Sequence, residues 1–138
     1  YTLWHTLSLH DALPISNVQI LGKKGGDELK KLVANSMFMI IPSEWYENAP
    51  MVIYEAFAMA KPVIGTDVGG ISELISPGKT GFLFPLGNIR ELQKHIQYFL
   101  DHRNELPKFG KAARELTEQK FSDENHYRKL FSVYKSLL

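Results

Sequence analysis

Apolar residues gather in short continuous runs that are separated by longer segments of mixed polarity. The runs MFMIIP (37–42) and PVIGTD (62–67) have the length of strands, and such runs are typical of strands buried on both faces of a parallel sheet. GFLFP (81–85) follows a turn and predicts a further short strand. NVQIL (17–21) predicts another strand, which the turn GKKGG closes.

The segments between these runs show the spacing of amphipathic helices. Asp27 opens the first helix, DELKKLVANS, which places three apolar residues on one face: Leu29, Leu32 and Val33. Pro50 suits the first position of a second helix, MVIYEAFAMA, because that position needs no backbone N–H. A short helix is expected at 71–75, after the glycines of VGG.

Three helical stretches close the chain, beginning near Asn88, Glu105 and Asp123. The last stretch carries one apolar stripe, formed by Tyr127, Leu130, Phe131 and Tyr134. The first contains KHIQYFLDHR (94–103), an amphipathic segment that leaves peripheral membrane contact open as an alternative to core packing.

Strands that alternate with helices at these spacings predict an α/β fold, with a Rossmann-like parallel sheet flanked by helices. Only about three or four strands are visible, whereas a complete doubly wound domain usually has about five or six. The pattern therefore predicts part of such a domain.

Composition narrows the function classes. With 138 residues, 44% of them hydrophobic, the chain can pack the core of one domain. Its formal net charge of +1 gives no electrostatic argument for nucleic-acid binding. No cysteine is present, which excludes disulfides and thiolate chemistry and fits a cytoplasmic location. The apolar runs are shorter than the roughly 20 residues of a membrane helix, so no transmembrane segment is expected.

The stretch with candidate chemistry is PSEWYENAPMVIYEAFAMAKPVIGTDVGGISE. A loop follows the predicted strand that ends at Ile41, and ligands of open α/β sheets bind at the carboxyl ends of strands. The loop enters a helix whose first N–H groups can hold a phosphate. Glu47 precedes this helix and Glu55 lies about two turns later, an axial gap of roughly 8–12 Å. Phosphate binding flanked by two carboxylates describes a sugar nucleotide.

Each carboxylate also has a plainer interpretation. Glu47 could interact only with the helix dipole, and Glu55 could be a solvated helix residue. The flanking residues favour the ligand site. Together they resemble the retaining family 4 glycosyltransferases of the GT-B fold, whose mark is two glutamates separated by seven residues, here Glu47 and Glu55. The resemblance extends over 17–138, including the PS loop, EAFAMAKPVI, TDVGGISE and KTGFLFP.

The resemblance implies roles for individual residues. Glu55 would bind the ribose hydroxyls of the donor, and Glu47 would bind the hydroxyls of the transferred sugar. Backbone N–H groups would hold the sugar and the distal phosphate; the candidates are Asn48, Ala49, Met51 and Val52. Gly69 and Gly70 would let the backbone turn close to the cleft, or form a plain strand-to-helix turn.

The function that the resemblance implies is hexose transfer with retention of anomeric configuration. The co-substrate would be a UDP- or GDP-hexose, with no cofactor and no metal, and the acceptor is open, a glycan or lipid-linked glycan being candidates. The family's basic arginine–lysine pair has no counterpart in this sequence. A non-catalytic module that binds nucleotide sugar is therefore the alternative, and the chain by itself is expected to be inactive.

Residues 1–16, YTLWHTLSLHDALPIS, resemble the translation of a sequencing adapter. The DNA ACT CTT TCC CTA CAC GAC GCT CTT CCG ATC occurs in a common short-read adapter, and it encodes residues 6–15. We expect this segment to be non-native, which removes His5, His10 and Asp11 as candidate site residues. Residues 17–138 are then expected to be a partial C-terminal nucleotide-sugar-binding domain.

Overall fold

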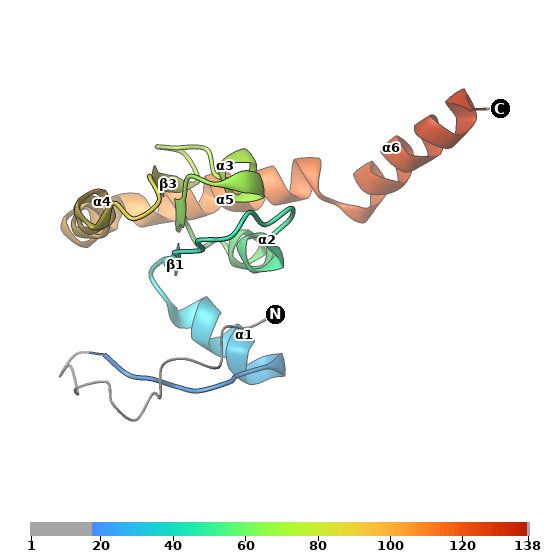
Figure 1. Cartoon of the computed structure of the whole chain (residues 1–138). Helices are drawn as coiled ribbons and strands as arrows, with labels where there is room; N and C mark the ends of the chain where they lie inside the picture. The colour runs from blue at the N-terminus through green and yellow to red at the C-terminus, as the bar shows by residue number, and fades with distance from the viewer. Residues whose placement is uncertain (1–17, 138) are drawn as a thin grey trace.

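A three-stranded parallel sheet forms the centre of the fold in the computed structural model, which describes residues 18–137 (Figure 1). The strands are β1 (Met39–Ile41), β2 (Val63–Thr66) and β3 (Gly81–Phe84), and they lie side by side in chain order. Both neighbouring pairs are parallel. The predicted α/β fold with a flanked parallel sheet is confirmed. The segment assigned to adapter, residues 1–16, lies outside the described residues.

Helices follow each strand, as the sequence predicts. Their bounds are α1 (Gly26–Asn35), α2 (Met51–Ala58), α3 (Gly69–Leu74), α4 (Ile89–Asp101), α5 (Leu106–Lys120) and α6 (Asp123–Ser136), with a short 3-10 helix at Arg103–Glu105. Pro50 is the residue before α2 rather than its first helical residue. No helix within residues 18–137 is long and apolar enough to cross a membrane.

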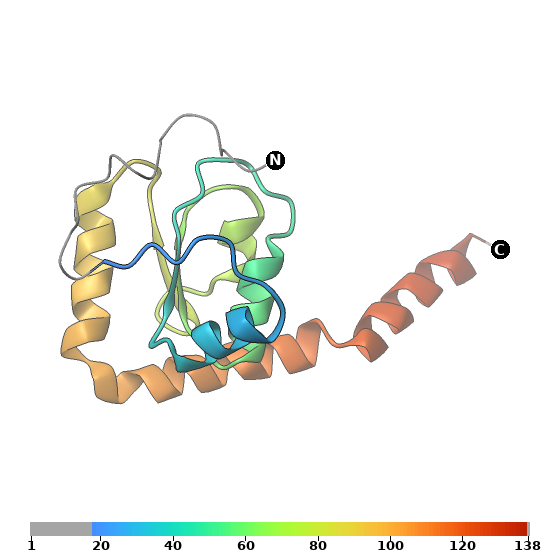
Figure 2. The ribbon, with the colours of Figure 1, turned by 90° about the horizontal axis from the view of Figure 1, so that it is seen from below.

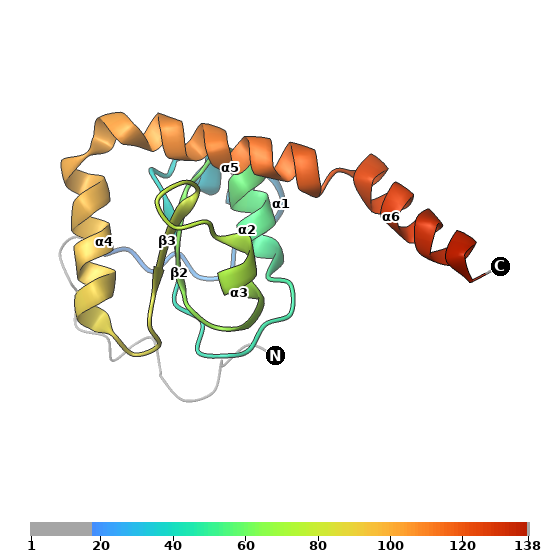
Figure 3. The same ribbon diagram turned by 90° about the horizontal axis from the view of Figure 1, so that it is seen from above.

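The core has two parts, one on each face of the sheet (Figure 3). On one face, α2 and α3 pack against β2 through residues such as Ile53, Phe57 and Ile71. On the other face, Phe99 of α4 packs near Phe84 of β3. Helix α5 runs across one end of the sheet and contributes to both parts, Phe109 to one and Ala113 to the other.

The strand predicted at 17–21 does not form within the described residues. Residues 18–22 have no strand assignment, and Val18, Ile20 and Leu21 are exposed. A strand needs hydrogen bonds from a neighbour, and among residues 18–137 β1 pairs with β2 alone. The apolar content of NVQIL was therefore a misleading signal for this structure.

Burial of β1 also differs from the prediction. Met39 and Ile41 pack against the cluster beneath α2, but Ile40 is 37% exposed, because α4 covers the opposite face over β2 and β3. At an edge strand, a continuous apolar run does not imply burial on both faces.

The stripe predicted on the last helix is present but is not part of the core. Tyr127, Leu130, Phe131 and Tyr134 lie on α6 and all four are exposed. Figure 2 shows the reason, since α6 extends away from the rest of the domain beyond the end of α5.

Candidate functional site

The loop 42–50 joins β1 to α2 at the carboxyl end of the sheet and carries most of the predicted site residues. Its start is anchored to the neighbouring strand by Thr66, whose side chain is buried. The Thr66 hydroxyl donates to the carbonyl oxygen of Ser43 at 2.6 Å and lies 3.3 Å from that of Ile41. The position of this loop is therefore fixed by the end of β2, in the place where parallel sheets bind ligands.

Glu47 is oriented within this loop by short-range hydrogen bonds. The Ser43 hydroxyl donates to Oε1 of Glu47 at 3.0 Å, and the Glu47 N–H donates to the carbonyl oxygen of Trp45 at 2.9 Å. The carboxylate remains exposed to solvent. It is thus positioned and still accessible to hydroxyl groups of a ligand.

Gly69 and Gly70 begin α3 and lie directly against this loop. The Gly70 N–H donates to the carbonyl oxygen of Glu47 at 2.7 Å. A Cβ atom at Gly70 would lie 2.0 Å from the carbonyl oxygen of Asn48, so no other residue fits without displacing the loop. Gly69 has a φ of +50°, a conformation that favours glycine. The two glycines allow α3 to hold the backbone on which Glu47 sits.

The start of α2 presents unpaired N–H groups. Pro50 is buried and caps the helix without a side-chain hydrogen bond. Within the part of the chain that the structure describes, none of the four predicted donors gives its N–H to another group: Asn48, Ala49, Met51 and Val52. Such groups at a helix start carry partial positive charge and attract anions.

Glu55 lies on the exposed side of α2, about one turn and a half into the helix. It borders a cavity of about 560 Å³ between α2 and the α5–α6 junction, which Ala49 and Met51 also line. Two lysines from the opposite wall, Lys120 and Lys129, line the same cavity. Glu47 does not line it. The predicted residues therefore fall into two neighbouring groups. Glu47 lies on the loop before α2, and Glu55, Ala49 and Met51 border the cavity.

The lysines were missed by reasoning from sequence. Lys120 ends α5 and Lys129 lies on α6, more than 60 residues after Glu55 in the chain, and no local motif marks them. His126 of α6 lines the cavity as well. Only the packing of α5 beside α2 brings these side chains near the predicted site. No cluster of three or more potential metal ligands occurs in residues 18–137.

Comparison with known proteins gives a consistent result. The sequence profile of a family described as "Glycosyl transferases group 1" matches residues 6–116. That range begins inside the segment 1–16, whose adapter origin stays a prediction. The chain is 36% identical over 125 residues to N-acetyl-alpha-D-glucosaminyl L-malate synthase of Bacillus anthracis, covering 88% of this chain and 31% of that protein.

Two solved structures are similar in fold. Sucrose-phosphate synthase from Thermosynechococcus elongatus matches with a TM-score of 0.78 and 28% identity, over 88% of this chain and 30% of that one. HepE of Anabaena in complex with UDP-glucose matches with a TM-score of 0.70 and 25% identity, over 77% of this chain and 29% of that one. The chain spans between a fifth and about a third of the length of the curated relatives that it matches first.

Proposed function

The chain belongs to the group 1 glycosyl transferases of the GT-B fold, and on this premise we propose that it forms part of the donor-binding domain of an enzyme that transfers a hexose from a nucleotide sugar with retention. The similarity covers about 30% of the relatives' length, which corresponds to part of a C-terminal GT-B domain. Donor, acceptor and activity of the whole enzyme are parts of this proposal.

One observation carries the proposal: within residues 18–137, four N–H groups at the end of the loop 42–50 and the start of α2 have no hydrogen-bond partner, and they lie between the two glutamates of the family pattern. A diphosphate is the ligand group that such a cluster of donors favours. A carboxylate on each side, Glu47 and Glu55, can accept hydrogen bonds from hydroxyl groups. A nucleotide sugar has its groups in this order: ribose hydroxyls, then the diphosphate, then the hydroxyls of the hexose.

Each residue then has a role. Glu55 binds the ribose hydroxyls, and the N–H groups of Asn48, Ala49, Met51 and Val52 hold the distal phosphate and the sugar. Glu47 binds the hydroxyls of the transferred hexose, in an orientation that Ser43 supports. UDP-hexose is the favoured donor, because the similar HepE structure contains UDP-glucose, and GDP-hexose is the other candidate.

The chemical step replaces one bond at the anomeric carbon of the hexose. The bond from this carbon to the diphosphate oxygen breaks, the acceptor's hydroxyl oxygen bonds to the same carbon, and the hydroxyl proton leaves with the diphosphate or water. Charge develops mainly on the departing diphosphate, so donors that face its oxygens lower the barrier. The unpaired N–H groups of α2 serve this purpose.

The test uses the intact enzyme with UDP-glucose and GDP-mannose as donor probes. Calorimetry should detect binding of one donor, and Glu55→Ala should weaken that binding by about tenfold or more, since a hydrogen bond to a charged group contributes roughly 1.5–3 kcal/mol. Glu47→Ala should lower turnover more than donor affinity. Glu44→Ala is the matched control, because Glu44 is an exposed glutamate of the same loop.

The outcomes separate the candidate functions. Unchanged binding and turnover in both Glu47→Ala and Glu55→Ala would refute the assignment. Donor binding without transfer to any acceptor would support a nucleotide-sugar-binding module instead. Residues 17–138 alone are expected to show no transfer, and the anomeric coupling constant of a product formed by the intact enzyme tests retention.

A further inference from the structure

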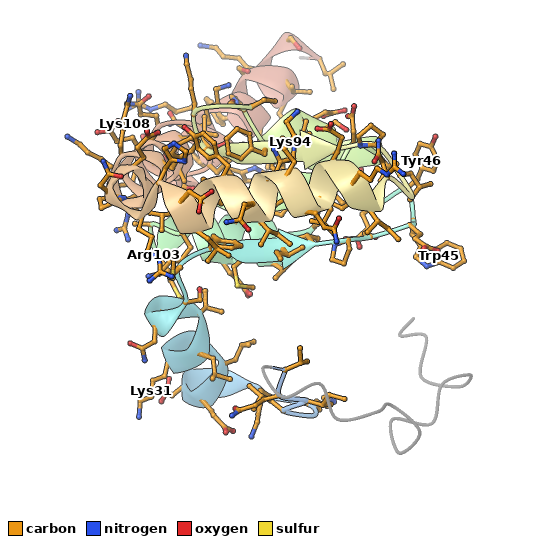
Figure 4. The ribbon with its side chains drawn as sticks, turned by 90° about the vertical axis from the view of Figure 1, so that its left-hand side faces the viewer. Lys31, Trp45, Tyr46, Lys94, Arg103 and Lys108 are labelled. Atoms are coloured by element: carbon orange, nitrogen blue, oxygen red, sulfur yellow. The ribbon has the colours of Figure 1, made fainter. Side chains whose placement is uncertain are left out.

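Two large aromatic side chains in the loop 42–50 are held out in solvent. Trp45 is 66% exposed and Tyr46 is 86% exposed, although both are immediate neighbours of Glu47. Figure 4 shows both at the same end of the domain, with the Trp45 ring pointing away from the body. Isolated exposed apolar residues are common, but two adjacent aromatic side chains beside a candidate site are a more specific feature.

The backbone that carries these aromatics is firmly held. The Trp45 N–H donates to the Ser43 hydroxyl at 3.4 Å, and the Trp45 carbonyl oxygen accepts the Glu47 N–H. Gly69 brings α3 so close that a Cβ there would lie 3.3 Å from the Cα of Tyr46. The main chain on both sides of each aromatic is therefore fixed by its neighbours. With the backbone held in this way, binding of a ligand needs to order only the two side chains.

The position of the rings along the proposed ligand identifies what they contact. The nucleoside end lies toward Glu55, the diphosphate lies at the start of α2, and the transferred hexose lies at Glu47. Trp45 and Tyr46 directly precede Glu47 in the chain, and neither lines the cavity that Glu55 borders. They are therefore placed at the hexose end of the proposed ligand, rather than at its base, and the group that receives the hexose must approach this end.

Sugar rings suit such a surface. One face of a pyranose carries mainly C–H groups, and an aromatic ring offers a flat apolar surface for it, while the Tyr hydroxyl and the indole N–H can bond ring hydroxyls. We infer that Trp45 and Tyr46 bind a sugar ring of the acceptor. This inference rests on the proposed function, and it specifies the acceptor as a saccharide or a molecule ending in one.

Saturation-transfer NMR on the intact enzyme with bound UDP tests the inference. The probes are the methyl α-glycosides of glucose, galactose, mannose and N-acetylglucosamine. At least one probe should receive saturation from the wild-type enzyme. Its dissociation constant should rise about 3- to 10-fold in Trp45→Ala and in Tyr46→Ala, which is the usual contribution of one aromatic contact. Trp45→Phe should recover most of the affinity, because the flat apolar ring remains.

Tyr127→Ala is the matched control, since Tyr127 is a similarly exposed tyrosine on α6, outside the loop. It should leave probe binding unchanged. Two results would overturn the inference: no saturation of any probe, or a probe affinity in both alanine variants that equals that of the wild-type enzyme. Weaker UDP binding in Trp45→Ala would overturn it too, because the ring would then contact the base. A wild-type dimer that Trp45→Ala dissociates would show a protein interface instead.

These outcomes are separate from those of the proposed function. UDP binding that Glu55→Ala abolishes supports the donor site whether or not a glycoside binds. An enzyme that binds UDP but saturates no glycoside refutes the acceptor inference alone.

Discussion

Replacement of Gly70 by alanine should displace the loop that carries Glu47. The new Cβ would lie 2.0 Å from the carbonyl oxygen of Asn48, whereas ordinary contact begins at 3.4 Å, so the two groups must separate by about 1.4 Å. Overpacking of this kind costs about 1–3 kcal/mol. The hydrogen bond from the Gly70 N–H to the Glu47 carbonyl, 2.7 Å long, would be weakened or lost at a cost of about 1 kcal/mol.

The expected loss of unfolding free energy is therefore about 2–4 kcal/mol. Because Glu47 lies on the displaced backbone, transfer by the intact enzyme should fall on the order of 100-fold, the effect that a shift of about 1 Å can have on catalysis. Urea denaturation of the chain measures the first quantity, and initial rates of transfer measure the second.

Gly25→Ala is the matched control for this substitution. Gly25 has an extended backbone, with a φ of −156°, and no heavy atom of residues 18–137 lies within 4 Å of a Cβ placed there. Its replacement should leave transfer unchanged and change the unfolding free energy by less than about 1 kcal/mol, because the entropy that alanine removes from the unfolded chain is opposed by its poorer capping of α1. A Gly70→Ala enzyme as stable and as active as the Gly25→Ala enzyme would refute the close-packing argument.

Three further substitutions test other parts of the structure. Thr66→Val should lower the unfolding free energy by about 1–3 kcal/mol in urea, because it leaves the Ser43 carbonyl without its buried donor; no loss would contradict the anchoring of the loop. Phe99→Ala should lower the unfolding free energy by about 3–5 kcal/mol in the same assay, since this ring is fully buried between sheet and helices. A smaller loss would indicate that the surrounding core collapses into the space left by the ring. The hydrogen bond from Tyr98 to the Glu105 carboxylate raises the pKa of Tyr98 above its ordinary value of about 10. A pKa raised by folding contributes stability below about pH 10 that is lost as the pH rises through the folded-state pKa, so Tyr98→Phe should flatten the fall of unfolding free energy above pH 10.

Most of the fold could be predicted because its signals are local. The runs that became β1, β2 and β3 are continuous and apolar, and the helices between them have clear spacing. NVQIL has the same local signal as a strand, but pairing depends on a neighbour that a local pattern does not describe. Helical spacing predicts the apolar stripe on α6, because it shows which residues share one face. The spacing does not show which element, if any, packs against that face, so the exposure of the stripe could not be predicted.

The sequence proposes a candidate site only where that site is contained in one short segment. Glu47 and Glu55 are eight positions apart in one loop-and-helix segment, so their approximate separation follows from the local sequence. The close approach of Gly70 to Asn48 depends on how α3 packs, and the lysines that line the cavity with Glu55 depend on how α5 and α6 are placed. Such contacts between distant parts of the chain leave no mark in a single sequence.

The placement of α5 across the end of the sheet has a consequence for cooperativity. Because one helix supplies side chains to both parts of the core, loss of α5 would uncover buried residues on both faces of the sheet at once. Gly110 reinforces this arrangement, since its lack of a side chain lets α5 lie directly on the backbone after α2. The two faces of the sheet should therefore unfold in a single step, and the amide hydrogens of α2 and α4 should exchange with solvent at the same free energy of opening.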